Sequence, residues 1–535
     1  MCKSVQLPTL TFLLAAASLL LPHTVLGIQD LPAEAQLEPE PYRPGDAEPP
    51  LDDGRPMLSM TLDEAIARAL EHNLDIRSAR LDPQIQELAL DGARAAFNPR
   101  FNATVGYNNS TSQSTSQLDG GTRITTEQNT FNLGLAQPLP WYGAELSAGF
   151  NNSRISTDNV FATRNPGYNS RFSLTYTQPL LSGRRIDNQR NAVRTQEIQQ
   201  WVTDAQLRDR IDDLTAQVRQ AYWGLRATIE QIEIQRRNLA QAEQLLANNR
   251  IQVELGTMVE MDLAQAEAQV ASAEQALLNA EVQWRNQELE FKRLLVSGSD
   301  DPLFQQAVNP VDLPEFDQVE VDIQAAIHEA LRNRPDLEAL RHQREISEMN
   351  LEVTEENRRP DLNLSLSYSL EGVGGDLYER QGLGGEPELV RQGGFTDGLS
   401  SIASFDTPTL NASLSFSYPI GWSPADSNLE QARIQNRQAE LNLQSQQLFI
   451  ETQVTNAGLA VQNAFQQLEA ARRSREAAER NAEAELTRFN VGVSTNFQVV
   501  TAQDQLTQAR LSELQATIDH INAVAEFERL QGQSW

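Results

Sequence analysis

The feature that most constrains the fold of this chain is an internal duplication. Shifting the sequence by 261 residues aligns residues 65–107 with residues 326–368, and 12 of these 43 pairs are identical. The matches fall on a helical pattern, a helix-breaking proline and an alternating segment. Later matches need shifts of 240 and 236, which places 21 additional residues in the first copy between Tyr107 and Pro179. We therefore expect two copies of one structural unit.

Each copy begins with a helical pattern. In the first copy Thr61 is the expected N-cap, and Glu64, three residues later, completes a capping box. We expect this first helix to end by Pro99 and its counterpart in the second copy to end by Pro360.

Segments in which apolar and polar side chains alternate strictly follow the first helices, and this is the period of a β-strand. They predict four strands at about 100–180 in the first copy and two in the second, at about 361–370 and 409–419. Each strand has about 9 or 10 residues, the length that a tilted strand needs to cross a bilayer. Alternation alone leaves open the edge of a soluble β-sandwich. Trp141 and Tyr142 fit either an aromatic belt at a membrane interface or a simple packed turn.

Very long stretches without proline follow the last strand of each copy. In the second copy an apolar stripe at steps of three and four runs from Leu429 to Phe489, or about 90 Å of helix. The first copy has its equivalent at about 188–255. Such a stripe predicts coiled-coil contacts. A glycine-containing interruption and about 40 more periodic residues follow each stretch, so we expect two long helical hairpins that turn near residues 256 and 492.

The N-terminal residues have the pattern of an export signal. Residues 1–27 combine Lys3, a short apolar run and small residues near the end, which predicts a signal peptide. A short N-terminal membrane anchor is the alternative. Cys2, the single cysteine of the chain, lies in this segment, so the exported chain is expected to contain no disulfide.

The remaining residues divide into a tether, two repeats and a linker. Residues 28–58 are rich in proline and acids and are expected to form an extended tether. The first repeat is assigned to residues 59–297, the linker to residues 298–320 and the second repeat to residues 321–535.

The charge and the motifs exclude several functions. The chain has 43 basic and 73 acidic residues, a net charge of −30, which argues against nucleic-acid binding. The sequence has no paired-histidine metalloprotease motif, no phosphate-binding loop after a strand and no nucleophile elbow. We therefore expect no enzyme, no catalytic residue, no cofactor and no metal.

Taken in order, these features resemble the TolC-like outer-membrane efflux protein family, and the resemblance extends from about residue 62 to residue 530. It is carried by Leu62-Asp63-Glu64-Ala65-Ile66, by Gln178-Pro179-Leu180 with Gly183-Arg184-Arg185, and by Arg488-Phe489-Asn490-Val491-Gly492-Val493-Ser494-Thr495. No one of these motifs is specific, but their order, repeated twice, is.

The resemblance implies an α+β membrane protein, a trimeric transmembrane β-barrel continued by a long periplasmic α-helical barrel of coiled-coil hairpins. It implies a homotrimer in contact with the lipid of the outer membrane of a Gram-negative-type bacterium. Family members usually supply four strands per protomer and so twelve per trimer. The six candidate strands here would give eighteen, unless one pair forms an extracellular or inward-folded hairpin.

The function implied by the resemblance is that of a passive exit duct in a tripartite efflux or type I secretion system. Such a duct receives substrates from an inner-membrane transporter through a periplasmic adaptor, or membrane fusion, protein. The alternative from the residues alone is a soluble periplasmic coiled-coil scaffold without channel activity.

The resemblance also implies two kinds of site at the helical turns. The positions that match the adaptor-docking tip are Leu255, Gly256, Thr257, Val491, Gly492, Val493, Ser494 and Thr495, and a plain helix–turn–helix connection is the alternative. Many family members place acids at the constricted tip as a gate, and the matching positions here are Asp262, Gln498 and Thr501. Because only Asp262 is acidic, a ring of aspartates is not expected. Asp262 is instead a candidate for holding the tip closed.

Overall fold

A computed structural model describes residues 47–50, 54–115, 121–256, 258–313, 321–382 and 385–532 of the chain. All of these belong to one compact unit, Ala47–Trp535. The signal peptide predicted at residues 1–27 and most of the tether predicted at residues 28–58 lie outside the described residues.

Short helices precede the strands and long helices follow them in each half of the chain. The elements are β1 (Met57–Met60), α1 (Leu62–His72), α2 (Leu74–Ala79), α3 (Asp82–Ala95), β2 (Arg100–Gln113), β3 (Arg123–Pro138), β4 (Glu145–Thr157), β5 (Arg164–Pro179), α4 (Asn188–Glu254), α5 (Glu260–Leu295), the 3₁₀ helix η2 (Pro302–Gln305), β6 (Ala307–Pro310), α6 (Ile323–Asn333), α7 (Pro335–Asn357), β7 (Asp361–Arg380), β8 (Pro387–Arg391), α8 (Phe395–Ala403), β9 (Pro408–Ser417), α9 (Pro424–Asn490) and α10 (Asn496–Leu530).

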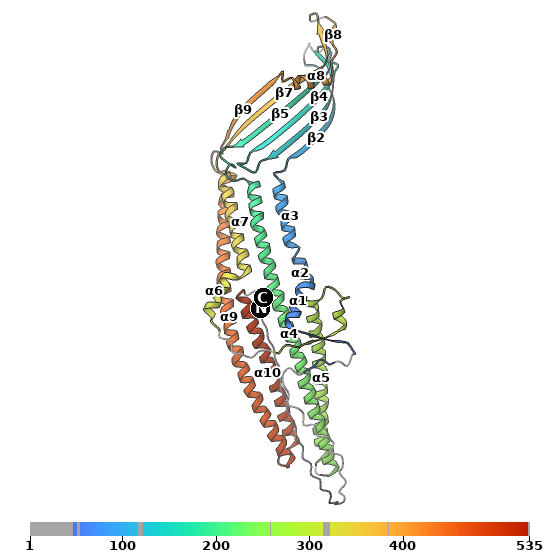
Figure 1. Cartoon of the computed structure of the whole chain (residues 1–535), viewed down its shortest axis with the longest axis vertical. Coiled ribbons are helices and arrows are strands. Elements are labelled where there is room, and N and C mark those ends of the chain that lie inside the picture. The colour runs from blue at the N-terminus through green and yellow to red at the C-terminus, as the bar shows by residue number, and fades with distance from the viewer. Residues whose placement is uncertain are drawn as a thin grey trace, which may run out of the picture. The chain divides into compact units, whose positions relative to one another are not determined.

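Within this unit the large sheet lies at one end of the long helices, and the turns of both helical hairpins lie at the other (Figure 1). The sheet runs in the order β2-β3-β4-β5-β7, with β9 paired to the first half of β7 and β8 to its end. All of these pairings are antiparallel. The six predicted strands are therefore present in one continuous sheet, but five of them have 13 to 20 residues and are longer than the predicted 9 or 10.

The register of the strands gives the sheet one apolar and one polar face. Residues that are paired across neighbouring strands point to the same face of a sheet. The apolar face is built from the pairs Phe101–Leu135, Leu133–Phe150, Phe150–Phe172, Phe172–Leu370 and Leu366–Ala412. The other face is built from pairs such as Asn102–Gly134, Asn132–Asn151, Asn151–Arg171, Thr175–Ser367 and Ser365–Ser413. This continuity across all six long strands is the pattern of a barrel wall with lipid on one side and water on the other.

One short helix that the sequence pattern did not predict packs on the apolar face. α8 approaches the sheet where β7 has glycines instead of side chains. A Cβ added to Gly372 would lie 1.9 Å from the carbonyl oxygen of Gly398, and one added to Gly374 would lie 2.1 Å from that of Gly394. The two strand glycines therefore allow the helix backbone to rest directly on the sheet.

The two longest helices, α4 and α9, have 67 residues each, and their bounds confirm the predicted stretches. α4 is capped by Asp187, whose side chain accepts a hydrogen bond from the backbone N–H of Arg190. α9 is capped by Ser423, which forms a capping box with Asp426. None of the helices in the described residues has an apolar stretch that is long enough to cross a membrane.

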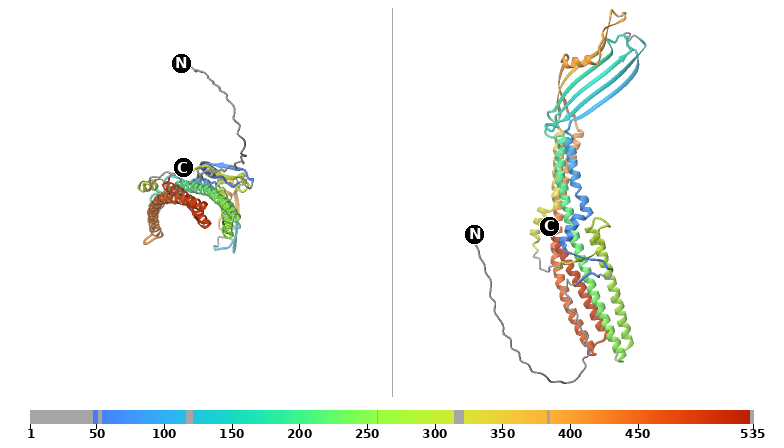
Figure 2. Two further views of the ribbon diagram at one scale, coloured as in Figure 1. Left: turned by 90° about the horizontal axis from the view of Figure 1, so that it is seen from below. Right: turned by 45° about the vertical axis from the view of Figure 1, so that its right-hand side comes forward.

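Seen along their axes, the long helices form a curved row (Figure 2). α5 packs on α4, α4 on α10 and α10 on α9. Nearer the sheet, α7 packs between α4 and α9, and α3 packs on the other side of α4. A curved row of this kind is suited to form part of the wall of a helical barrel.

The predicted first helix is correct at its start and wrong in its extent. The capping box of Thr61 and Glu64 is present. The segment before Pro99 is nevertheless three helices, because the Asn73 side chain accepts hydrogen bonds from the N–H groups of Asp75 and Ile76 and starts α2. In the second copy the corresponding break comes at Arg334, directly before Pro335.

The predicted tether and linker are also more ordered than the sequence suggested. β1 lies at the end of the predicted tether and pairs in parallel with β6, which lies within the predicted linker. η2 lies there too. The reason is that Glu288 on α5 is completely buried, and groups from both segments satisfy its charge: Arg55 at 3.0 Å and the N–H of Val308 at 3.1 Å.

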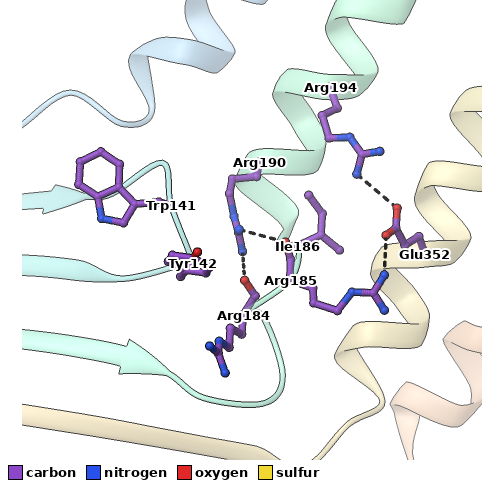
Figure 3. Close-up of a pocket in the computed structure, with 8 residues that line it drawn as sticks. All are labelled: Trp141, Tyr142, Arg184, Arg185, Ile186, Arg190, Arg194 and Glu352. Carbon is purple, nitrogen blue, oxygen red and sulfur yellow. Dashed lines mark hydrogen bonds and ion pairs between the residues drawn. The ribbon is translucent and has the colours of Figure 1, made fainter.

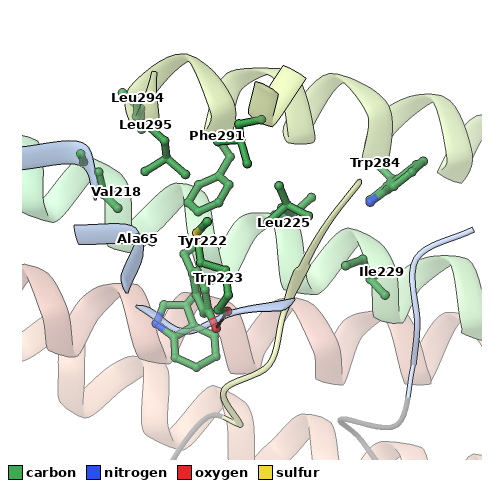
Figure 4. Close-up of a cluster of buried hydrophobic side chains, with 14 of the residues drawn as sticks. Ala65, Val218, Tyr222, Trp223, Leu225, Ile229, Trp284, Phe291, Leu294 and Leu295 are labelled. Atoms are coloured by element: carbon green, nitrogen blue, oxygen red, sulfur yellow. Dashed lines mark hydrogen bonds between the residues drawn. The ribbon is translucent and has the colours of Figure 1, made fainter. Parts of the chain in front are cut away.

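The largest hydrophobic core surrounds this junction (Figure 4). Tyr222 of α4 is fully buried and meets the ring of Phe291 of α5 edge-on, with 6.0 Å between ring centroids. The Tyr222 hydroxyl lies 2.9 Å from Asp312 Oδ2, so its polar end is satisfied. Aromatic and aliphatic side chains of α1, α4 and α5 thereby join the first hairpin to the N-terminal segment.

Candidate functional site

The first hairpin turns at Gly256, which has a φ of +73° and ends α4 in the left-handed conformation. Leu255 beside it is 73% exposed. Thr257, also predicted as part of the docking tip, lies outside the described residues. Val259 is the N-cap of α5 and is exposed.

The second hairpin turns in the same way at Gly492, which has a φ of +78°. Val491 and Val493 on either side are 70% and 73% exposed. Thr495 caps α10 and forms a capping box with Gln498. Both predicted turns are therefore present, and each displays apolar side chains to solvent.

Ser494 makes a local contact that the sequence analysis missed. Its hydroxyl donates to Glu485, a buried carboxylate that also pairs with Arg488 at 3.1 Å. The hydrogen bond from Ser494 lowers the pKa of Glu485, and the Arg488 guanidinium acts in the same direction. Glu485 thus holds the second turn through its side chain.

The three gate candidates have different surroundings. The Gln498 side chain accepts a hydrogen bond from the N–H of Thr495, 3.2 Å away, so it caps its own helix. The Thr501 hydroxyl donates to the carbonyl oxygen of Phe497 at 2.7 Å. Asp262 lies in the first turn of α5 and is half-buried. No hydrogen bond or ion pair within the described residues joins Asp262 to Gln498 or Thr501.

The two hairpin ends are joined by a pair of asparagines that sequence reasoning did not identify. Asn249 near the end of α4 donates from Nδ2 to Oδ1 of Asn496, the first residue of α10, at 2.9 Å, and both side chains are buried. Asn496 Nδ2 in turn lies 3.4 Å from the backbone carbonyl oxygen of Asp262. An apolar cluster of Leu245, Phe489, Val499 and Val500 packs beside this contact. In the sequence, a polar residue inside an apolar helical stripe was the one signal that could have pointed to this contact.

Two more exposed apolar side chains extend the tip surface. Met261 and Phe497, each the second residue of the helix that follows its glycine, are 80% and 63% exposed. Together with Leu255, Val491 and Val493 they form what we call the tip patch. Exposed apolar side chains gathered at the ends of two hairpins are typical of a protein–protein contact surface.

A sheet with a lipid-type face, followed by helical hairpins with an apolar tip patch, defines a channel protein of the outer-membrane efflux class. The family model described as outer membrane efflux protein matches residues 65–145, 144–296 and 326–533. The chain belongs to this family. It is an outer-membrane efflux channel with a large periplasmic part, and its family is one of transport proteins.

Solved structures have the same fold. The outer membrane protein VceC of Vibrio cholerae has 13% sequence identity and a TM-score of 0.63, with 88% of this chain and 96% of that chain covered. The outer membrane channel CmeC of Campylobacter jejuni has 15% identity and a TM-score of 0.62, with 89% and 86% covered. The MtrE outer membrane channel of Neisseria gonorrhoeae, in its open state, has 17% identity and a TM-score of 0.60, with 88% of each chain covered. The sequence has no match among curated proteins.

Proposed function

We propose that three copies of the chain assemble into the exit duct of a tripartite efflux or type I secretion system, in which one outer-membrane barrel continues into one periplasmic helical tunnel. The observation that carries the proposal is the pair of open sheet edges. Within the described residues β2 pairs only with β3, and β9 only with β7. Unpaired backbone groups are not tolerated in hydrocarbon, so β9 of one copy is expected to pair with β2 of the next.

The same edges support a barrel of eighteen strands. β2 leads away from the helices and β9 leads back toward them, so a β9–β2 contact between copies is antiparallel like the other pairs. Six strands from each of three copies would then close into one barrel. The soluble scaffold is disfavoured because its sheet would expose the whole apolar face to water.

Cysteine cross-linking tests this arrangement in a chain whose single natural cysteine, Cys2, lies in the predicted signal peptide. One cysteine replaces Ala103 of β2, and a second replaces Leu410, Ala412 or Leu414 of β9 in three separate variants. After oxidation, we expect at least one pair of cysteines to give disulfide-linked trimers on a denaturing gel. Two cysteines placed on the polar face of β3 and of β9 are the control, because they are too far apart to form a disulfide. If none of the three pairs links separate chains, the proposed closure is wrong.

We further propose that the tip patch receives the periplasmic adaptor, through which the inner-membrane transporter delivers substrate. Its exposed apolar side chains support this assignment. Val491→Asp or Val493→Asp is expected to abolish export in cells while single-channel conductance in planar bilayers is retained, and Val493→Ile is the matched control. Loss of conductance together with export would instead indicate misfolding.

Asp262 remains our candidate for holding the tip closed, with Gln498 and Thr501 at the matching positions of the second copy. Its support is its place beside the asparagine pair. Asp262→Asn is expected to raise the single-channel conductance, and an unchanged conductance would contradict the hypothesis. The excess of acidic residues is expected to favour cations over anions in the lumen.

A further inference from the structure

Four arginines gather where the sheet meets the helices. The turn between β3 and β4, the segment from β5 to α4, the start of α4 and one residue of α7 line an open cavity of about 550 Å³ (Figure 3). The lining residues are Trp141, Tyr142, Arg184, Arg185, Ile186, Arg190, Arg194 and Glu352. This concentration of positive charge occurs in a chain whose net charge is −30.

Arg190 fixes the backbone segment that lines this cavity. Its guanidinium pairs with Asp187 at 2.8 Å and donates to the carbonyl oxygens of Gly183 at 2.6 Å and Arg184 at 3.1 Å. The segment before α4 is thereby held in a fixed conformation. The side chains of Arg184 and Arg185 are both exposed on it.

Two of the other three arginines share one acid, and the third packs on a tyrosine ring. Arg185 and Arg194 both contact Glu352, at 3.4 and 3.3 Å. Arg184 stacks on Tyr142, with its guanidinium carbon 5.8 Å from the ring centroid, and no ion pair is seen for it within the described residues. Three guanidinium groups against one carboxylate leave about two positive charges at the cavity, since Arg190 is neutralised by Asp187.

A row of side-chain contacts connects the cavity to the apolar face of the sheet. Tyr176 lies on that face, opposite Leu366, and its hydroxyl donates to Gln178 Oε1 at 2.8 Å. Gln178 Nε2 donates to the carbonyl oxygen of Tyr142 at 2.7 Å, and Arg184 packs on the Tyr142 ring. Trp141 beside it is 57% exposed. The arginines therefore lie at the helix-side border of the lipid-type face, where tyrosine and tryptophan mark a membrane interface.

The second copy of the repeat lacks this cluster. With the shift of 240 residues, Arg184 and Arg185 correspond to Pro424 and Ala425, and Ile186 corresponds to Asp426. The arginines are therefore not required to join a strand to a long helix. They are a feature added at one of two otherwise equivalent junctions.

We propose that this cavity binds the phosphate of an anionic phospholipid in the periplasmic leaflet of the outer membrane, once per chain. Guanidinium groups form paired, charge-assisted hydrogen bonds with phosphate oxygens. Basic pockets at a membrane surface are suited to anionic head groups. Arg184 and Arg185 hold the phosphate, Arg194 supplies further positive charge, and Trp141 and Tyr142 lie against the glycerol and upper acyl region.

The test is lipid titration of the purified, delipidated full-length protein, followed by native mass spectrometry. Phosphatidylglycerol is compared with phosphatidylcholine, whose head group carries no net charge. We expect Arg184→Gln/Arg185→Gln to weaken phosphatidylglycerol binding at least about tenfold, since each charge-assisted hydrogen bond contributes substantially. Arg473→Gln/Arg480→Gln removes two exposed arginines from the lower part of α9 and should leave binding unchanged.

Three results would overturn the proposal. They are retention of wild-type binding by the double variant, equal weakening by the α9 control, and equal binding of phosphatidylcholine. Inorganic phosphate is titrated in competition, and full displacement at millimolar concentration would assign the cavity to a soluble anion and overturn it too. If the double variant does not fold, Arg184→Gln and Arg184→Lys are compared. Arg184 makes no structural ion pair, so Gln should weaken binding and Lys should partly retain it.

Discussion

Lys292 Nζ lies 2.9 Å from Glu288 Oε1, and both side chains are completely shielded from solvent. Arg55 adds a second positive charge at 3.0 Å from Glu288. The N–H of Val308 donates to Glu288, and the Lys292 ammonium donates to the carbonyl oxygen of Gln306. One buried carboxylate thus joins the first hairpin to the N-terminal segment and to the segment between the repeats.

Glu288→Gln is expected to destabilise the protein strongly. Removing the carboxylate takes away the buried negative charge that Lys292 and Arg55 both contact, and breaking a buried pair on one side costs about 3–5 kcal/mol. The free energy of unfolding is measured by guanidinium titration followed by circular dichroism. Glu290→Gln on the same helix is the control. Its pair with Arg293 is exposed, so the change should be within about 0.5 kcal/mol. Equal losses in the two variants would contradict this account.

Asn496→Ala should loosen the contact between the two hairpin ends. It leaves Asn249 buried without its hydrogen-bond partner, which costs about 1–3 kcal/mol. We expect a higher single-channel conductance in planar bilayers, because the proposed closed tip depends on this contact. Asn490→Ala removes an exposed asparagine just before the same turn and should leave the conductance unchanged. Equal conductance of Asn496→Ala and the wild type would count against a role for the pair in closure.

Gly492→Ala tests how much the left-handed backbone conformation of the second turn costs when the residue has a Cβ atom. The glycine has a φ of +78°, and a Cβ there would meet nothing within 4 Å, so the cost of about 1–2 kcal/mol is due to the left-handed conformation alone. Gly92→Ala in α3 is the opposite case. It also meets nothing within 4 Å, but in a helix it should stabilise by about 0.5–1 kcal/mol. Thermal midpoints should therefore move in opposite directions.

His520 should make the helical part less stable in mild acid. Burial, and then the nearby Arg472 guanidinium, lower the pKa of this side chain from its ordinary value of 6.5. The folded protein thus binds this proton less readily than the unfolded chain does. The contribution of His520 to the free energy of unfolding is therefore complete above pH 6.5. It is lost progressively as the pH falls toward the lowered pKa. In His520→Phe this part of the pH dependence of unfolding should disappear, whereas His72→Gln, at a more exposed position, should retain it.

The sequence was sufficient to predict those elements whose residue pattern is long and local. The stripe from Leu429 to Phe489 predicted α9 because many regularly spaced residues define one helix. The alternation in the strands predicted the two faces of the sheet, because the period of two is intrinsic to the strand. Gly256 and Gly492 marked the turns for the same local reason.

The elements that were missed depend on residues far apart in the chain. β1 and β6 are four residues each and are ordered by pairing across 250 positions. The partners Asn249 and Asn496 are 247 residues apart, so no local pattern could pair them. α8 needs the glycines of β7 beneath it, and the Asn73 side chain that interrupts a helical pattern donates to the carbonyl oxygen of Leu294, 221 residues away. In each case a tertiary contact outweighs the local preference.

The apolar face of the sheet also determines the order in which such a molecule can be built. The helical hairpins bury most of the α9 stripe within one chain. The six strands cannot bury their apolar face in this way, because that face and their two open edges would be exposed until lipid and neighbouring copies cover them. Newly exported chains therefore require protection of residues 100–179 and 361–417 during their passage. In the proposed trimer the sheet is then the last part to reach its final structure, and membrane insertion is the step that commits three chains to one another.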